Sequence, residues 1–250
     1  MEVLDLKLPA ANVIKDSLGE GAHAMVYLYK LSKGCGVLVS KEQPWFNALE
    51  KKSSKKVYAP EDPINFQGEL SEHVGLILSG TAKAVSYSEN GDETWLGRFS
   101  EGEFFGHTSF LTQSPVNFEI TAETDMVALL VPVKSIPEMF ESNSEIGVVF
   151  ARDLAERLDM MMRRLVEALT LSAKGRVCAE LIRMSNPIGV DPDRHIVRPN
   201  PVFVDLALRI NSTRETVSRT VSELQKKGIV SREPGALVIQ SPEKLKASVK

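Results

Sequence analysis

The residues best suited to chemistry with another molecule lie in the segment 213–219, which reads TRETVSR. The spacing of Val217, Val221 and Leu224 predicts a helix over 213–226 that buries this apolar face. The opposite face then carries four polar side chains, those of Arg214, Glu215, Ser218 and Arg219. An Arg fork matches O6 and N7 of guanine, and a Glu carboxylate accepts from N4 of cytosine. The segment therefore predicts a helix that reads base edges in the major groove of double-stranded DNA.

The elements around this helix complete a larger motif. A short helix is predicted over 205–209 and a turn over 210–212, while 186–200, rich in Pro and Gly, is expected to be a loop. Two short apolar strands flank 233–235. Hydroxyl groups that can donate to phosphate oxygens belong to Ser212, Thr213 and Thr216. We expect a winged helix-turn-helix; a helical hairpin used for protein contacts is the alternative.

Charge is distributed unevenly along the chain. From Lys174 to the C-terminus, 14 Lys and Arg stand against 8 Asp and Glu. This net charge of +6 leaves −9 for residues 1–173 within the total of −3. An acidic front and a basic tail favour a sensor joined to a nucleic-acid-binding module.

The remaining segments predict the fold class. Short apolar runs separated by turns, including a tight hairpin at Asn90–Gly91, are typical of antiparallel strands. We expect an α+β protein with an N-terminal jelly-roll sensor domain over 56–133, a linker and long dimerisation helix over 134–172, and the winged helix-turn-helix over 173–250. Residues 1–55 form an N-terminal extension, in which PWFNALEKKS at 44–53 predicts one or two helical turns opened by Pro44.

The predicted long helix carries an apolar stripe. Its members alternate four and three residues apart: Leu154, Leu158, Met161, Leu165 and Ala168. That spacing is typical of the seam between two helices. Val166 and Leu169 widen the apolar face. We expect the stripe to form the interface of a homodimer; packing against the protein's own sheet is the alternative.

Several segments resemble the Crp/Fnr family of bacterial transcription regulators over about 56–245. The resemblance rests on TRETVSR at 213–219, FQGE at 66–69, GEFFG at 102–106 and KGRV at 174–177. It implies that Arg214, Glu215 and Arg219 read bases, and that a homodimer binds a palindrome with TGTGA-like half-sites. Where members often carry polar residues that contact phosphate, directly before the first helix, this chain carries Val202, Phe203 and Val204.

The segment FGHTSFLTQSPVNFEI differs from the cyclic-nucleotide pocket of that family. Members that bind cAMP carry a Glu for the ribose and an Arg for the cyclic phosphate, and this chain has His107 and Val116 at those positions. A buried phosphate without a cation is costly, so we expect regulation without cAMP. The predicted sensor pocket comprises His107, Thr108, Val116, Asn117, Phe118, Met161 and Met162.

No cofactor is expected in that pocket. Its lining predicts either an apolar ligand or a pocket that is filled by its own side chains. Haem held by His107 is an alternative, because the family's carbon-monoxide sensor uses a His near this point of its roll. A packed core histidine is the other interpretation of His107. A regulator without a ligand, controlled by its abundance, also stays open.

Other classes of protein find little support. Motifs of hydrolases, metalloproteases and P-loop enzymes are missing, so no enzyme is expected. Two cysteines, Cys35 and Cys178, predict free thiols rather than a disulfide framework or metal site. Without a signal peptide or a long apolar run, we expect a cytoplasmic protein with no membrane partner. The expected partners are DNA, a second copy and, for an activator, RNA polymerase; a sensor module acting on a partner protein is the competing function.

Overall fold

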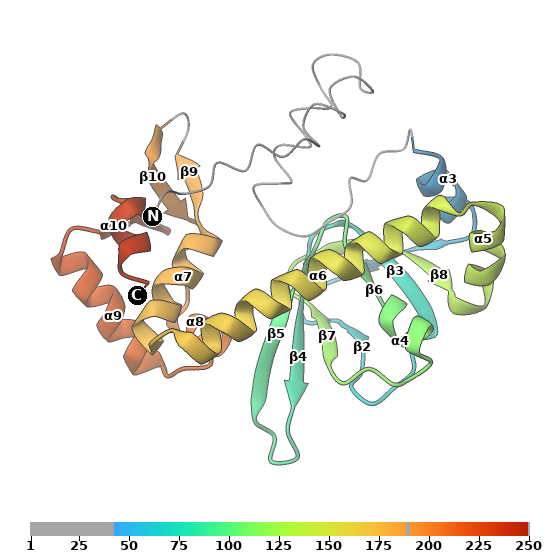
Figure 1. Cartoon of the computed structure of the whole chain (residues 1–250), viewed down its shortest axis with the longest axis horizontal. Coiled ribbons are helices and arrows are strands. Elements are labelled where there is room, and N and C mark those ends of the chain that lie inside the picture. The colour runs from blue at the N-terminus through green and yellow to red at the C-terminus, as the bar shows by residue number, and fades with distance from the viewer. Residues whose placement is uncertain (1–42, 189–190, 250) are drawn as a thin grey trace.

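The computed structural model describes residues 43–188 and 191–249, and the predictions for 1–42, including that for Cys35, lie outside them. The chain forms a β-roll, one long helix and a C-terminal domain of helices and a small sheet (Figure 1). The long helix, α6 (Glu145–Thr170), crosses the roll and ends beside the C-terminal domain. The expected α+β architecture is confirmed.

Two antiparallel four-stranded sheets form the roll. The first has the order β1 (Ser54–Tyr58), β8 (Met126–Pro132), β3 (His73–Ser79), β6 (Phe104–Phe105). The second has the order β2 (Pro63–Asn65), β7 (Glu119–Ala122), β4 (Thr81–Tyr87), β5 (Glu93–Ser100). Six of these strands coincide with the short apolar runs of the sequence, namely β1, β3, β4, β5, β7 and β8.

The roll has two apolar cores on opposite faces of the first sheet. The inner core lies between the two sheets and includes Ile77, Phe99 and Phe105. The outer core joins the first sheet to the helices and includes Leu76 and Phe104. Strand β3 is buried on both faces, which explains its continuous apolar sequence rather than an alternating one.

The hairpin at Asn90–Gly91 is confirmed, but it is wider than a tight turn. Strands β4 and β5 pair as far as Tyr87 and Glu93, so the loop spans Ser88–Asp92. The backbone N–H of Ser88 donates to the carbonyl of Asp92 across 3.0 Å. Gly91 has φ +82°, a conformation that favours glycine.

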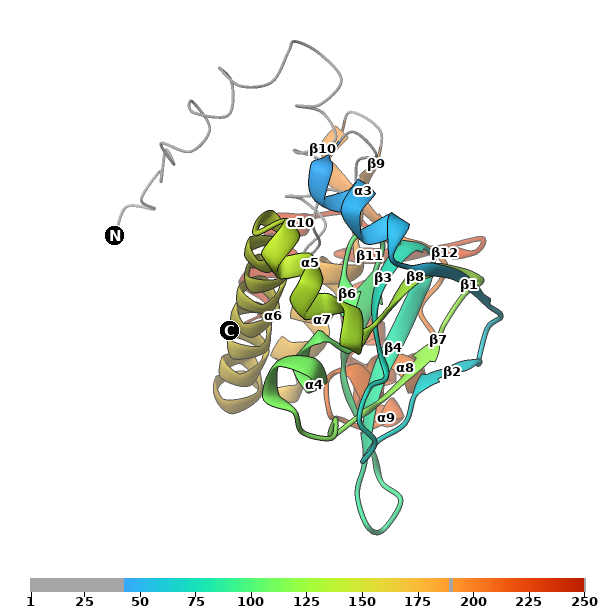
Figure 2. The ribbon, with the colours of Figure 1, turned by 90° about the vertical axis from the view of Figure 1, so that its right-hand side faces the viewer.

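Four helices lie on one side of the roll, against the outer core (Figure 2). They are α3 (Pro44–Lys51), α4 (His107–Thr112), α5 (Ile136–Ser142), which follows the 3₁₀ turn Val133–Ser135, and α6. Helix α4 was not predicted, because its residues lie within the segment that aligns with the pocket motif of the family. The described helices include none that is long and apolar enough to cross a membrane.

The C-terminal domain contains the predicted helix-turn-helix and wing. Its helices are α7 (Ala173–Met184), α8 (Phe203–Arg209), α9 (Arg214–Lys226) and α10 (Pro242–Ala247). A third sheet has the order β11 (Val230–Glu233), β12 (Ala236–Ile239), β10 (Asp191–Val197), β9 (Asn186–Ile188). The prediction of a loop over 186–200 was wrong in part, because β10 gains pairing partners in β12 that lie far away in sequence.

Candidate nucleic-acid interface and sensor core

The turn between α8 and α9 is closed by backbone hydrogen bonds. The N–H of Ser212 donates to the carbonyl of Ala207 across 2.9 Å, and that of Asn211 donates to Leu208 across 3.2 Å. Asn211 has φ +47°, a left-handed conformation that Asn tolerates better than most residues. The turn therefore has a defined geometry that fixes where α9 begins.

Helix α9 begins at a capped N-terminus. The Thr213 side chain accepts a hydrogen bond from the backbone N–H of Thr216, and the two hydroxyls lie 3.1 Å apart. Thr213 was predicted as the first helical residue, and it is the N-cap, which satisfies one of the free N–H groups of the first turn. Its hydroxyl and that of Thr216 lie at the start of the helix, where a phosphate would approach.

The two faces of α9 divide as the sequence predicts. Val217, Val221 and Leu224 are buried in the core of the C-terminal domain. The opposite face has Arg214, Glu215 and Arg219 exposed and Ser218 half-buried. The pKa of Glu215 lies below its ordinary value, because backbone N–H groups at the helix start and the Thr213 hydroxyl stabilise the carboxylate. An ionised acceptor therefore lies between two guanidinium groups on an accessible face.

Arg176 of α7 holds the turn in place, a contribution that the sequence did not reveal. Its Nε donates to the carbonyl of Ile210 across 3.0 Å, and its Nη2 donates to that of Asn211 across 3.3 Å. Its Nη1 donates to the carbonyl of Leu171, at the end of α6, across 3.0 Å. One planar fork thus joins the long helix to the helix-turn-helix. The only sequence signal was that Arg176 belongs to the motif KGRV.

The wing and the start of α8 differ in character from the face of α9. Gly235 in the β11–β12 turn has φ +69°, and Arg232 on β11 stacks over the ring of Phe203 at 5.1 Å from its centroid. Val202 and Val204 are exposed. The predicted departure from polar residues at this point therefore leaves apolar side chains on the surface beside the wing.

The predicted dimer stripe lies on the face of α6 that points away from the roll. Helix α6 buries Ile146, Val149 and Phe150 against the outer core. By contrast, Leu158 is 61% exposed and Leu165 51% exposed. The other stripe members also lie outside the core: Leu154 is half-buried, and Met161 and Ala168 are exposed. The alternative that the stripe packs on the protein's own sheet is wrong.

His107 is a packed core residue. Its side chain is 2% exposed, and its ring lies 6.1 Å from that of Phe104 and 5.8 Å from that of Phe150. Its Nε2 lies 3.1 Å from Oδ2 of Asp153 on α6. This arrangement does not fit a haem ligand, because the nitrogen that would face the iron faces a carboxylate instead.

The predicted sensor pocket does not assemble around His107. His107 faces the outer core, whereas Phe118 packs against the inner core between the sheets. Val116 is buried, and Thr108, Asn117, Met161 and Met162 are exposed. A linear motif does not show this division, because His107 lies on α4 whereas Val116, Asn117 and Phe118 lie in the segment between α4 and β7.

A charged pair that the sequence did not single out lies at the inner core. Arg157 of α6 extends over the ring of Phe99 at 3.8 Å from its centroid, and its Nη2 lies 3.4 Å from Oε2 of Glu103. Glu103 also accepts from the backbone N–H of Ser100 across 2.9 Å. Burial raises the pKa of Glu103 to about 7, although Arg157 acts in the opposite direction.

Two family models match the chain. The cyclic nucleotide-binding domain model matches residues 55–143, and the Crp-like helix-turn-helix domain model matches residues 175–248. The chain belongs to the Crp/Fnr family. It is a DNA-binding transcription regulator of the Crp/Fnr type.

Curated relatives extend over most of this Crp/Fnr chain. The global nitrogen regulator of Nostoc sp. is 26% identical over 183 residues, which cover 72% of this chain and 82% of the relative. The CRP-like cAMP-activated global transcriptional regulator of Mycobacterium tuberculosis is 21% identical over 211 residues, covering 84% of this chain and 94% of the relative. The second relative is activated by cAMP according to its name, and the first is named for nitrogen regulation.

Solved structures share the fold of this Crp/Fnr protein. The c-di-GMP responsive global regulator CLP of Xanthomonas campestris has a TM-score of 0.68 at 17% identity, covering 78% of this chain and 97% of that one. A CooA mutant from Carboxydothermus hydrogenoformans has a TM-score of 0.69 at 18% identity, covering 84% of this chain and 93% of that one. These similarities support the architecture of roll, long helix and helix-turn-helix.

Proposed function

We propose that this regulator binds as a homodimer to a palindromic DNA site with TGTGA-like half-sites, and that it does so without cAMP. The observation that carries the proposal is the exposed face of α9, where ionised Glu215 lies between Arg214 and Arg219. Arg pairs with guanine and Glu with cytosine in the major groove. Ser218 completes the base-reading face, and Ser212, Thr213 and Thr216 contact phosphate.

The exposed stripe on α6 supports the homodimer. Apolar residues that are half or more exposed, such as Leu158, Leu165 and Leu169, are costly in a lone chain when they lie together on one helix. A second copy of α6 would cover them at the spacing of a two-helix seam. Two copies of α9 would then face two half-sites related by the same two-fold axis.

Three features of the roll support independence from cAMP. His107, at the position of the ribose-binding Glu, is taken up by Asp153 and by two phenylalanine rings. Val116, at the position of the phosphate-binding Arg, is buried and offers no charge. Arg157, a cation that reaches the inner core, is already paired with Glu103. We therefore do not extend activation by cAMP from the Mycobacterium tuberculosis relative to this chain.

We further propose a division of labour along the chain. The predicted boundary at residue 56 cuts β1, which begins at Ser54, and leaves out α3, which packs in the outer core, so we assign 44–133 to the sensor roll. Residues 134–172 act as linker and dimerisation helix, and 173–250 act as the DNA-binding domain. A regulator with no bound ligand and a regulator with an apolar ligand in the inner core both agree with this division. A sensor module acting on a partner protein disagrees with this division, because its C-terminal domain would bind protein and would make no salt-dependent contact with DNA.

The experiment is a titration of a labelled palindromic duplex, followed by fluorescence anisotropy at several salt concentrations. We expect the TGTGA palindrome to bind at least about 10³-fold more tightly than a scrambled duplex, with affinity falling as salt rises, because phosphate contacts release counterions. Equal affinity for the two duplexes would contradict sequence-specific binding. The absence of any salt-dependent binding would favour the partner-protein alternative.

A further inference from the structure

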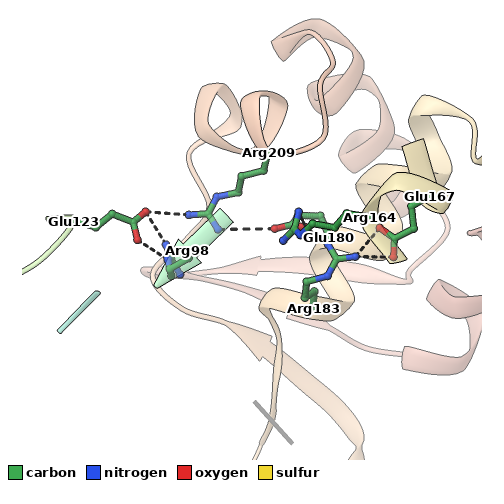
Figure 3. A network of polar contacts seen from close by, with 7 residues as sticks. All are labelled: Arg98, Glu123, Arg164, Glu167, Glu180, Arg183 and Arg209. Carbon is green, nitrogen blue, oxygen red and sulfur yellow. Dashed lines mark hydrogen bonds and ion pairs between the residues drawn. The ribbon is translucent and has the colours of Figure 1, made fainter. Parts of the chain in front are cut away.

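A cluster of charged side chains lies where the roll, the long helix and the DNA-binding domain meet (Figure 3). We call it the interdomain junction. Its members are Arg98, Glu123, Arg164, Glu167, Glu180, Arg183 and Arg209, with the ring of Trp95 beside them. The three parts of the chain each contribute at least one charged group, so the junction is a contact between domains rather than within one.

Arg209, at the end of α8, is the centre of the junction. Its Nη2 lies 3.4 Å from Oε1 of Glu123, which follows β7 of the roll, and its Nη1 lies 3.8 Å from Oε1 of Glu180 on α7. Its side chain is 10% exposed. Arg98 on β5 binds the same Glu123 carboxylate through Nε and through Nη2, the latter at 3.0 Å. Glu123 therefore binds one cation of the roll, Arg98, and one cation of the DNA-binding domain, Arg209.

Trp95 on β5 adds an aromatic surface to these ion pairs. The guanidinium of Arg164, on α6, lies 4.4 Å from its ring centroid, and that of Arg209 lies 5.2 Å away. Both distances are within the range of a cation–π interaction. The indole thus contacts a cation from the long helix and one from the DNA-binding domain.

Glu180 neutralises the cations on the other side of the junction. Its side chain is 2% exposed, and it pairs with Arg183 and, at 3.7 Å, with Arg164. Arg183 also reaches Glu167 on α6 at 2.6 Å. Ion pairs at this depth are screened by salt much less than surface pairs. Separating the domains or removing one partner would leave a buried charge without compensation. The ion pairs therefore favour the one arrangement of the domains in which every charge has its partner.

The junction leaves the reading face of α9 untouched. It binds the DNA-binding domain through α7 and α8, and none of its members lies on α9. Arg214, Glu215 and Arg219 are exposed in the same structure in which the junction contacts are formed. The junction contacts are therefore compatible with an accessible DNA-reading helix.

The junction shares two elements with the charged pair of the inner core. Strand β5 carries Trp95 and Arg98 at the junction, and it carries Phe99, over which Arg157 lies. Helix α6 carries both Arg157 and Arg164, about two turns apart. A displacement of β5 or α6 at the inner core would therefore move the residues that hold the DNA-binding domain.

We propose that the interdomain junction holds the DNA-binding domain in one orientation on the roll and so orients α9 for DNA before the DNA arrives. The orientation of a reading helix in the free protein affects affinity, because a domain that is already placed loses less freedom on binding. The consequence for affinity rests on the DNA-binding function proposed above, whereas the holding of the domain does not.

The test compares Glu123→Gln with a matched control, Glu61→Gln. Both variants remove a carboxylate that pairs with a cation on the second sheet, but Glu61 pairs with Lys83 at 3.2 Å and forms no ion pair with the described residues of the DNA-binding domain. Hydrogen exchange measured by mass spectrometry reports the amides of 93–100 and 203–212. A second junction variant, Trp95→Leu, keeps the proposal testable if Glu123→Gln fails to fold.

We expect faster exchange in both segments for the junction variants and wild-type exchange for Glu61→Gln. Unchanged exchange in 203–212 for both junction variants would overturn the proposal. We also expect the junction variants to bind the palindromic duplex at least about fivefold more weakly than wild type, within the range of coupling between sites. Equal or tighter binding together with faster exchange would overturn the orienting effect.

The two proposals fail in different ways. If the wild-type protein shows no specific DNA binding, the proposed function is wrong, and hydrogen exchange still decides whether the junction holds the domain. If the wild-type protein binds specifically but exchange is insensitive to the junction variants, the further inference alone is wrong.

Discussion

The buried carboxylate of Glu103 makes the stability of the roll depend on pH. Burial raises the pKa of Glu103 to about 7 in the folded protein, from an ordinary value of 4.5. Below pH 4.5 both the folded and the unfolded state carry the proton. Between pH 4.5 and pH 7 the folded state keeps the proton and the unfolded state loses it, so the free energy of unfolding falls as pH rises. Above pH 7 this contribution no longer changes.

The substitution Glu103→Gln removes this titration while keeping a side chain of similar shape. Gln can still accept the hydrogen bond from the N–H of Ser100. From pH 5.5 to pH 8, the two pKa values predict that wild type loses about 2 kcal/mol of unfolding free energy relative to the variant. Glu101→Gln, an exposed change in the same loop, is the control.

Urea unfolding followed by tryptophan fluorescence measures this difference. The chain has two tryptophans, and both lie in or against the roll: Trp45 in the outer core and Trp95 on β5. The difference in unfolding free energy between Glu103→Gln and wild type should grow by about 2 kcal/mol between pH 5.5 and pH 8. The same difference for Glu101→Gln should stay constant. A constant difference for Glu103→Gln as well would refute the buried, proton-holding environment of Glu103.

Three further changes test other parts of the structure. Arg176→Ala should lower the unfolding free energy of the DNA-binding domain by about 2–3 kcal/mol, because three carbonyls lose a charged donor. Arg176→Lys should recover less than half of this loss, because an ammonium lacks the planar fork. Thermal unfolding of Arg176→Ala equal to that of wild type would contradict the contribution of Arg176. Leu158→Lys should dissociate the homodimer, because it places a charge in the exposed stripe, and an unchanged sedimentation coefficient would reject the seam. Addition of cAMP should leave the melting temperature unchanged, whereas a tight ligand would raise it by mass action.

The elements with strong local signals could be predicted from the sequence. Helix α9 has an apolar face at helical spacing and a Thr at its N-cap, so both its existence and its exposed face follow from residues within one segment. Strand β3 is a short apolar run between turns. In each case the information lies within about ten residues, where propensity and spacing act directly.

The features that depend on distant partners could not be predicted. Strand β10 forms because β12 pairs with it, and Arg176 acts on carbonyl groups, which every residue carries. Glu123 and Arg209 are 86 positions apart, and nothing in either segment indicates the other. The sensor pocket was predicted from a motif aligned by sequence, and such a motif does not reveal that the chain from α4 to β7 passes from the outer core, where His107 packs, to the inner core, where Phe118 packs.

The most direct test of the account concerns the contact between Arg214 and a base. Affinities of wild type and Arg214→Ala are measured by anisotropy on the TGTGA palindrome and on duplexes in which each guanine of the half-site is replaced in turn. We predict that wild type loses about 1–3 kcal/mol at one guanine and that Arg214→Ala loses nothing further at that same position. If the variant discriminates at every guanine as strongly as wild type, α9 does not read the site as proposed.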